Sequence, residues 1–269
     1  MNIDSPEFMS SLISIAENAA KEILEIYESD FSVENKKDDS PLTAADMASH
    51  NMIIAGLQDL TPEIPILSEE SVAIPFETRQ SWDRYWLIDP LDGTREFVKR
   101  NGEFTVNIAL IENHQPVLGI VYVPVSHLCY YSNKGQGAFK QESGKDAIPI
   151  RTKSTSGNDF TVAGSRSHGS ELQQNFFAAL GSKVEIIAIG SSLKLCLVAE
   201  GMVDIYPRFG LTSEWDTAAA HAIVCEAGGI VTDTELNKLE YNRKDSILNP
   251  HFLVIADKAF DWSTYLEDS

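Results

Sequence analysis

The run of strand-forming residues over 104–131 constrains the fold of this chain more than any other stretch. It reads FTVNIALIENHQPVLGIVYVPVSHLCYY, with β-branched and aromatic residues in three segments that turn formers separate. Such short connections favour antiparallel neighbours, because a parallel connection needs a crossover of a dozen residues or more. The sequence therefore predicts an antiparallel meander of three strands.

Two amphipathic helices are predicted ahead of this meander. The first begins after Ser5, an N-cap residue followed by Pro6 in the first turn, and apolar residues recur at helical spacing to about residue 29. The second lies within DDSPLTAADMASHNMIIAGLQDL, where Thr43 and Asp46 form a capping-box pattern.

A polar segment over 140–159 divides the chain, and we place the boundary near residue 150. Beyond it, predicted strands alternate with helices over 170–180, over 191–200 and from near Asp216. This order is typical of an α/β arrangement. The sequence thus predicts an N-terminal α+β half, 1–150, and a C-terminal α/β half, 151–269.

Composition narrows the possible partners. The 269 residues include 40 acidic and 21 basic ones, for a formal net charge of −19. A surface of this sign repels phosphate backbones, which excludes broad electrostatic binding to nucleic acid, whereas a small anion can bind if metal ions supply positive charge. The sequence shows neither a signal-peptide pattern nor a run of about 18 apolar residues, and we expect Cys129, Cys196 and Cys225 to be buried, reduced thiols. These features predict a cytoplasmic protein with no transmembrane segment.

Carboxylates gather where predicted strands end or helices begin. IPILSEE ends in Glu69–Glu70, RYWLIDPLD carries Asp89 and Asp92, and Asp216 opens a helix. A single acid at a strand end is usually a turn former or a helix cap. Three such junctions indicate a site for Mg²⁺, which takes carboxylate ligands, and two ions about 3.5–4 Å apart would offset the repulsion between Asp89 and Asp92.

The spacing within DPLDGT separates two phosphatase chemistries. Phosphatases with a D-x-D-G-T motif use the first aspartate as a covalent nucleophile, and the second aspartate follows two positions later. Here Asp92 follows Asp89 by three positions, with Pro90 between them. This favours attack by water that metal ions activate. The N–H groups of Gly93 and Thr94 open a predicted helix and would receive a phosphate, while Thr94 can also act as a plain helix cap.

Two motifs resemble signatures of a known family. WLIDPLDGTREF is similar to the first signature of the inositol monophosphatase superfamily, and EWDTAAAHAIVCEAGG is similar to the second. KRNGEFTVNIALIENHQPVLGIVYVP, AGSRSH and GSSLKLC resemble the CysQ-type branch, the 3′(2′),5′-bisphosphate nucleotidases. The resemblance spans roughly residues 5 to 257.

The resemblance implies a five-layer α-β-α-β-α sandwich, two Mg²⁺ ions with a third allowed near Glu69, and inhibition by lithium. It implies that the metal ligands are Glu69, Asp89, the Leu91 carbonyl, Asp92 and Asp216. It also implies that Thr94 orients the attacking water and that Asp46 is the hydrogen-bond partner of Thr94. Together with the metal ligand Glu69, these two are the implied catalytic residues: Asp46, Glu69 and Thr94.

The implied reaction converts adenosine 3′,5′-bisphosphate to AMP and phosphate, a step linked to sulfate assimilation. Residues at the ends of predicted strands and at helix starts are the candidates for binding this nucleotide. They are Gly93, Thr94, Arg95, Ser165, Arg166, Ser167, His168, Gly190, Ser191, Ser192, Lys194, Arg208 and Asp216. His221, five residues past Asp216, is expected to have a packing or hydrogen-bonding role.

Two other functions compete with this interpretation. One is an inositol monophosphatase or another sugar-phosphate phosphatase that uses the same metal ions, and the other is a non-catalytic metal-binding scaffold. The resemblance also allows a homodimer and a peripheral location at the cytoplasmic face of the inner membrane. The strongly acidic chain shows no basic amphipathic helix that would itself predict such a location.

Overall fold

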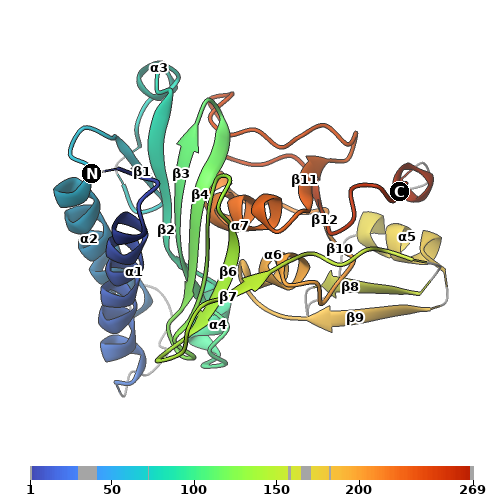
Figure 1. Cartoon of the computed structure of the whole chain (residues 1–269), viewed down its shortest axis with the longest axis horizontal. Coiled ribbons are helices and arrows are strands. Elements are labelled where there is room, and N and C mark those ends of the chain that lie inside the picture. The colour runs from blue at the N-terminus through green and yellow to red at the C-terminus, as the bar shows by residue number, and fades with distance from the viewer. Residues whose placement is uncertain are drawn as a thin grey trace.

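The structure is a computed structural model, and it describes residues 2–29, 41–71, 73–156, 159–164, 171–181 and 183–266. Its elements stack as a helix pair, a sheet, a helix pair, a sheet and a helix, which Figure 1 shows from left to right. This arrangement confirms the predicted α-β-α-β-α sandwich.

The outer layer beside the first sheet consists of α1 (Pro6–Tyr27) and α2 (Pro41–Leu60). Ser5 caps α1 as predicted, since its Oγ accepts a hydrogen bond of 3.2 Å from the N–H of Phe8. The predicted capping box of α2 is wrong, because the helix already begins at Pro41 and its second turn holds Asp46. Proline is favoured in the first turn, so the helix starts before the Thr43 signal.

The first sheet has seven strands that lie side by side in chain order. They are β1 (Ile66–Ser68), β2 (Arg84–Asp92), β3 (Thr105–Glu112), β4 (Gln115–Val123), β5 (Leu128–Asn133), β6 (Gly137–Glu142) and β7 (Ile148–Ile150). β1 and β2 are parallel, and every later pair is antiparallel. The predicted meander is confirmed as β3–β5, and it continues through β6 and β7 into the segment that the sequence indicated to be a polar connection.

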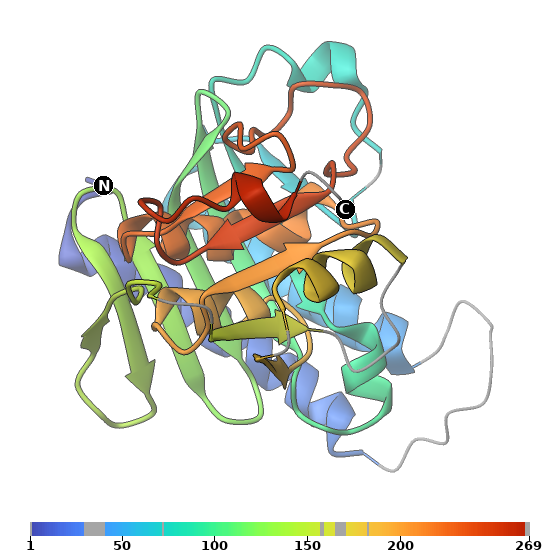
Figure 2. The ribbon, with the colours of Figure 1, turned by 90° about the vertical axis from the view of Figure 1, so that its right-hand side faces the viewer.

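The second sheet has five strands in the order β11-β12-β10-β8-β9. They are β8 (Phe160–Gly164), β9 (Val184–Ala188), β10 (Ile205–Arg208), β11 (Ile230–Asp233) and β12 (Phe252–Ile255). β8, β9 and β10 run parallel, while β12 is antiparallel to both of its neighbours. This half lies in front in Figure 2, with α5 (Glu171–Ala179) over the outer face of the sheet.

The two helices between the sheets are α6 (Leu193–Ala199) and α7 (Glu214–Glu226). A Cβ added to Gly119 of β4 would lie 2.0 Å from the carbonyl oxygen of Ala219 in α7. Only glycine permits this approach of helix backbone to strand backbone. α7 is therefore seated directly on the first sheet, and its first turn is fixed relative to the ends of the strands.

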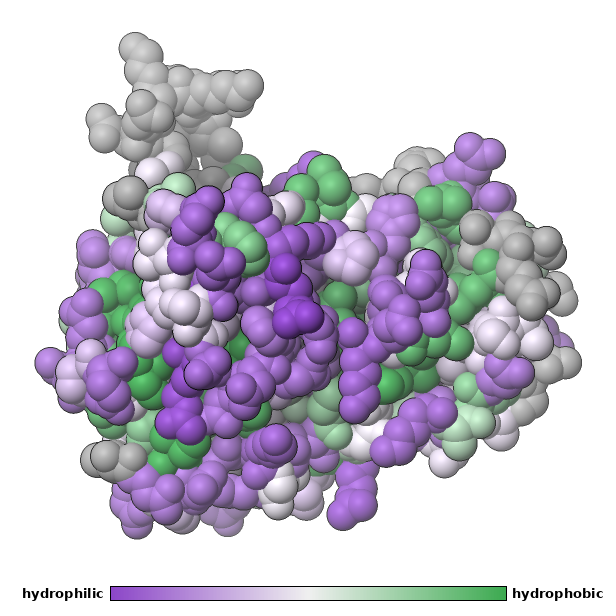
Figure 3. All heavy atoms as spheres, turned by 90° about the horizontal axis from the view of Figure 1, so that it is seen from above, coloured by the Kyte–Doolittle hydropathy of each residue, from purple (hydrophilic) through white to green (hydrophobic). Residues whose placement is uncertain are grey.

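Short helices complete the fold: α3 (Phe76–Arg79), α4 (Thr94–Val98) and a 3₁₀ turn at Ser263–Tyr265. Cys129 and Cys196 are buried as expected, but Cys225, in the last turn of α7, is exposed. Hydrophilic side chains cover most of the face in Figure 3. Among the described residues, no helix has both the length and the apolar character that a membrane span requires.

Candidate metal centre and ligand cavity

The parallel pairing of β1 with β2 brings two acids together. Ser68 pairs with Ile88, and the N–H of Glu69 donates to the Ile88 carbonyl at 3.2 Å. Glu69 therefore lies beside Asp89. The strand register shifts between Asp89 and Asp92, and the N–H of Leu91 turns back to Asp89 Oδ1 at 3.0 Å. The proline after Asp89 thus belongs to an irregularity that redirects the chain at the end of the strand.

A third acid arrives from the layer between the sheets. Asp216 lies in the first turn of α7, where its Oδ2 accepts the N–H of Ser213, the N-cap residue, at 2.9 Å. Glu69, Asp89 and Asp216 each offer a carboxylate oxygen, and these oxygens lie within 4.8 Å of one another. The fold thus brings together three of the acids that the sequence indicated.

The electrostatics of this cluster favour a cation. Asp89 is only 1% exposed, and its burial, together with the charges of Asp92 and Glu69, raises the pKa of its carboxyl well above the usual range. Burial and the charge of Asp92 raise the pKa of Asp216 to about 7. Buried acids that repel one another are costly unless positive charge neutralises them. Hard carboxylate oxygens in this number fit Mg²⁺, so the residues present match the implied metal.

Asp92 lies next to the three-acid cluster and is bonded to Ser192. Its Oδ2 accepts the N–H of Ser192 at 2.6 Å and lies 2.7 Å from Ser192 Oγ. The carboxylate still lines the same cavity as Asp89 and Asp216. Asp92, at the end of β2, therefore belongs to the same acidic group, and its Oδ2 is bonded to Ser192 at the start of α6.

Asp46 projects from α2 towards the acids. Its burial and the charges of Glu70 and Glu69 raise the pKa of its carboxyl to about 8. Within the ranges that the structure describes, no hydrogen bond joins Asp46 to Thr94, although the resemblance implied that the two are partners. Thr94 begins α4 and lines the cavity, directly after Gly93 at a φ of 99°, in the left-handed region that favours glycine.

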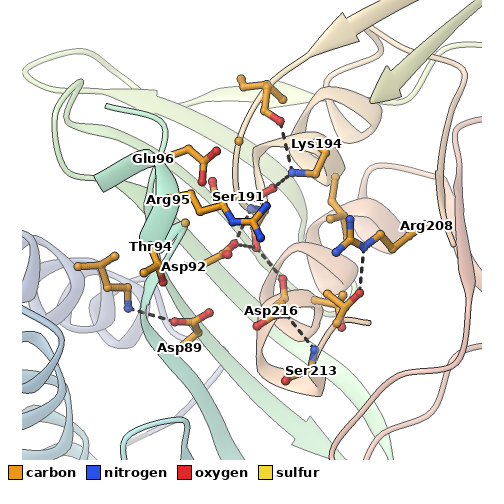
Figure 4. Close-up of a pocket in the computed structure, with 18 of the residues that line it drawn as sticks. Asp89, Asp92, Thr94, Arg95, Glu96, Ser191, Lys194, Arg208, Ser213 and Asp216 are labelled. Atoms are coloured by element: carbon orange, nitrogen blue, oxygen red, sulfur yellow. Dashed lines mark hydrogen bonds between the residues drawn. The ribbon is translucent and has the colours of Figure 1, made fainter. Parts of the chain in front are cut away.

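One cavity of about 430 Å³ lies over these acids. Lys194 and Arg208 also line it, on the side away from Asp89 (Figure 4). Lys194 Nζ donates to the Ser191 carbonyl at 2.8 Å, and burial lowers the pKa of its ammonium group. Arg208 is anchored by Nε to Thr212 Oγ1 at 3.2 Å. The cavity is thus lined by both acidic and basic side chains, with Asp89 and Arg208 on opposite sides of it.

The other predicted ligand residues have different outcomes. Arg95 and Ser191 line the cavity. Gly190 also lines it, but its N–H is already bonded to Glu103 Oε2 at 2.8 Å. Ser165–His168 lie outside the described residues. His221 is buried, with Nδ1 2.9 Å from the Tyr241 hydroxyl, which agrees with the role expected for it.

Two further polar residues of this region were not predicted from the sequence. Lys99 lines the cavity, and Asn107 is buried with its Nδ2 2.9 Å from Ser192 Oγ. A signal for Asn107 exists, since it is the one amide within the apolar strand sequence TVNIALI. A buried amide needs hydrogen-bond partners, so its presence there marks a polar neighbourhood.

Comparison with known proteins agrees with this geometry. The sequence model of the inositol monophosphatase family matches residues 5–260. The chain belongs to this family. Among its relatives is the 3′(2′),5′-bisphosphate nucleotidase CysQ of Salmonella typhimurium, which is 49% identical over 249 residues, covering 91% of this chain and 98% of the relative.

Solved structures of the family share the fold. CysQ from Bacteroides thetaiotaomicron, a bacterial member of the inositol monophosphatase family, superimposes with a TM-score of 0.85 at 40% identity, covering 96% of this chain and 100% of that one. An inositol monophosphatase from Zymomonas mobilis has a TM-score of 0.78 at 25% identity, covering 97% and 98%.

Proposed function

We propose that this chain is a Mg²⁺-dependent phosphatase that hydrolyses the 3′-phosphate of adenosine 3′,5′-bisphosphate, giving AMP and phosphate, as part of sulfate assimilation. The observation that carries the proposal is one cavity lined both by the carboxylates and by the cations Lys194 and Arg208, with Asp89 and Arg208 on opposite sides of it. A substrate with two phosphates can place one at the carboxylates and the other at Lys194 and Arg208. The CysQ relatives, which are named as nucleotidases for such bisphosphates, support this substrate class.

The acids are assigned to two cation positions. Glu69, Asp89 and the Leu91 carbonyl would hold the first Mg²⁺, and Asp89, Asp92 and Asp216 the second; the family resemblance allows a third near Glu69. When bound, Mg²⁺ would neutralise these carboxylates, activate the attacking water and stabilise the charge that develops on the leaving 3′-oxygen.

The protein's own groups orient the reactants. Thr94 is assigned to align the attacking water with phosphorus, and Asp46 to accept a proton through the Thr94 hydroxyl. Burial and the charges of Glu70 and Glu69 raise the pKa of the Asp46 carboxyl, so it is a stronger proton acceptor than an ordinary aspartate. This assignment requires the two side chains to form a hydrogen bond once substrate is bound, as catalytic contacts often do.

Basic and polar residues are assigned to the rest of the nucleotide. Arg208 and Lys194 would receive the 5′-phosphate, since the hydrogen bonds that anchor them leave further N–H donors for an anion. Arg95, Gly93 and Ser191 line the same cavity. The predicted contacts of Ser165–His168 remain part of the proposal.

A side-by-side assay tests this function. Phosphate release from adenosine 3′,5′-bisphosphate and from inositol 1-phosphate is measured with Mg²⁺, with Ca²⁺ in its place, and with added Li⁺. We expect kcat/KM to be at least about tenfold higher for the bisphosphate, which corresponds to about 1.4 kcal/mol, with no release in EDTA and inhibition by Li⁺. Preference for inositol 1-phosphate would indicate an inositol monophosphatase, and Mg²⁺ binding without release from either substrate would indicate a metal-binding scaffold.

A further inference from the structure

Strand β3 lies directly behind the metal acids. In the register of β2 with β3, Asn107 pairs with Asp89, and Thr105 pairs with Asp92. Both β3 side chains are fully buried and bonded to each other, with Thr105 Oγ1 donating to Asn107 Oδ1 at 3.0 Å. This bond orients the amide so that Asn107 Nδ2 points to Ser192 Oγ at 2.9 Å, with Asp92 Oδ2 3.5 Å away.

Ser192 connects this strand with both helices between the sheets. It is the N-cap residue of α6 and is 2% exposed. Its N–H donates to Asp92 Oδ2, and its Oγ lies 2.7 Å from that same oxygen and 2.6 Å from the carbonyl oxygen of Asp216. The single hydroxyl proton has these two acceptors, while the hydroxyl oxygen accepts from Asn107. Ser192 was expected to bind substrate, but its N–H and its hydroxyl are both used in hydrogen bonds within the protein.

The adjacent serine differs. Ser191 has no hydrogen-bond partner for its Oγ among the described residues, and it also lines the cavity. Among the described residues, it is Ser192 that joins Asp92 to the first turn of α7. The hydrogen bonds that the described residues make to the Asp92 carboxylate all reach Oδ2, which leaves Oδ1 for the cavity.

We propose that Ser192 and Asn107 are positioning residues, which fix the Asp92 carboxylate relative to Asp216 and so set the second cation position, and that Ser192 is not a substrate ligand. This inference rests on the proposed function only in that it needs a divalent cation to bind. Partners that orient metal ligands typically change metal affinity by ten- to a hundredfold when they are removed.

The test is Mg²⁺ binding to the purified full chain by isothermal titration calorimetry. Ser192→Ala and Asn107→Leu, the second of which keeps the number and branching of the side-chain heavy atoms, should each weaken Mg²⁺ binding by about tenfold or more. The double variant should bind Mg²⁺ about as weakly as whichever single variant has the lower affinity, because both residues act through one chain of hydrogen bonds. Ser192→Thr, which keeps the hydroxyl, should recover most of the affinity.

A matched control is Ser132→Ala. Ser132 is a buried serine of β5 whose Oγ has no partner among the described residues, and it lies outside the cavity lining. Its replacement should leave Mg²⁺ affinity unchanged. A purely structural role would lower the thermal midpoint of Ser192→Ala and Asn107→Leu in EDTA without changing their Mg²⁺ affinity, and that result would overturn the inference. If the unmodified chain bound no Mg²⁺, the proposed function would fail as well, so the two failures are distinguishable.

Discussion

The backbone N–H of Asn242 donates to both carboxylate oxygens of Glu214, at 3.1 and 2.9 Å, two residues before Asp216. The Asn242 side chain bonds in turn to the buried Arg79, through Oδ1 to its guanidinium at 2.5 Å and through Nδ2 to its carbonyl at 2.6 Å. The start of α7 is thereby tied to α3 and to the loop that contains Asn242.

Replacement of Asn242 should destabilise the fold in two separable steps. Asn242→Gly removes the amide and leaves the buried Arg79 without those bonds, which should lower the free energy of unfolding by about 2 kcal/mol. Asn242→Ala should lose about 1 kcal/mol more, because Asn242 has a φ of 54°, which alanine adopts at a cost. Urea denaturation measures the free energy of unfolding of both variants. Equal losses would contradict the proposed cost of the positive φ for alanine.

Asp89→Asn should abolish the response to Mg²⁺. We expect Mg²⁺ at a hundredfold excess over its dissociation constant to stabilise the unmodified protein by about 2.7 kcal/mol, seen as a higher thermal midpoint. The variant should show little of this shift and a loss of turnover greater than about a hundredfold. Asp59→Asn, at an exposed position of α2, serves as the control and should behave like the unmodified chain. An undiminished Mg²⁺ shift in Asp89→Asn would remove Asp89 from the metal centre.

Asp46 should make the metal-free protein less stable as pH rises. Its folded pKa of about 8 lies above the value near 4 of an unfolded aspartate, so between these values the folded state binds more protons. Stability from this group is therefore lost from pH 4 towards pH 8. Asp46→Asn in EDTA should gain stability relative to the unmodified protein from pH 5 to pH 8, by thermal unfolding. A difference that does not change with pH would refute this.

His221 should act in the opposite direction. Burial lowers its pKa to about 3, against about 6.5 when unfolded, so between these values the unfolded state binds more protons. Stability should therefore fall as pH drops from 6.5, with a limiting slope of about 1.4 kcal/mol per pH unit. His221→Gln should reduce the fall in the free energy of unfolding below pH 6.5, measured by denaturation at several pH values. His127→Gln, at an exposed position, is the control and should leave that fall unchanged. Equal slopes in all three proteins would count against a buried, neutral imidazole.

Arg208→Ala should change substrate preference rather than chemistry. Removing the guanidinium should raise KM for adenosine 3′,5′-bisphosphate by about tenfold or more while kcat changes little, because the contact is to the phosphate that does not react. Arg243→Ala, in an exposed ion pair with Glu240, provides the comparison. If kcat fell and KM stayed constant, Arg208 would belong with the reacting phosphate instead.

Much of the fold could be predicted from local patterns. The meander, the first helix and the alternation of the second half follow from apolar periodicity and capping residues, which act between near neighbours in the chain. β6 and β7 escaped prediction because polar and exposed side chains of an edge region weaken the alternation. The capping box of α2 was misread because Pro41 and Thr43 are competing start signals only two residues apart.

The acids of the site were predicted, but their partners were not. Positions at strand ends and at a helix start indicate Glu69, Asp89 and Asp216, and the family resemblance implies that they are ligands of shared metal ions. The Asn107–Ser192 contact joins residues from different layers, and local sequence carries no information on such a pairing beyond a buried amide. Because this contact is not visible in the sequence, the position of Ser192 at a helix start indicated only a substrate-binding role.

The seating of α7 against Gly119 brings the acids of the proposed site together from separate pieces of the polypeptide. A protease cut between Ile150 and Phe160 would leave one fragment with Glu69, Asp89 and Asp92 and the other with Asp216. Neither fragment alone would carry the full set of proposed metal ligands. During synthesis, that set can be complete only after α7 has left the ribosome.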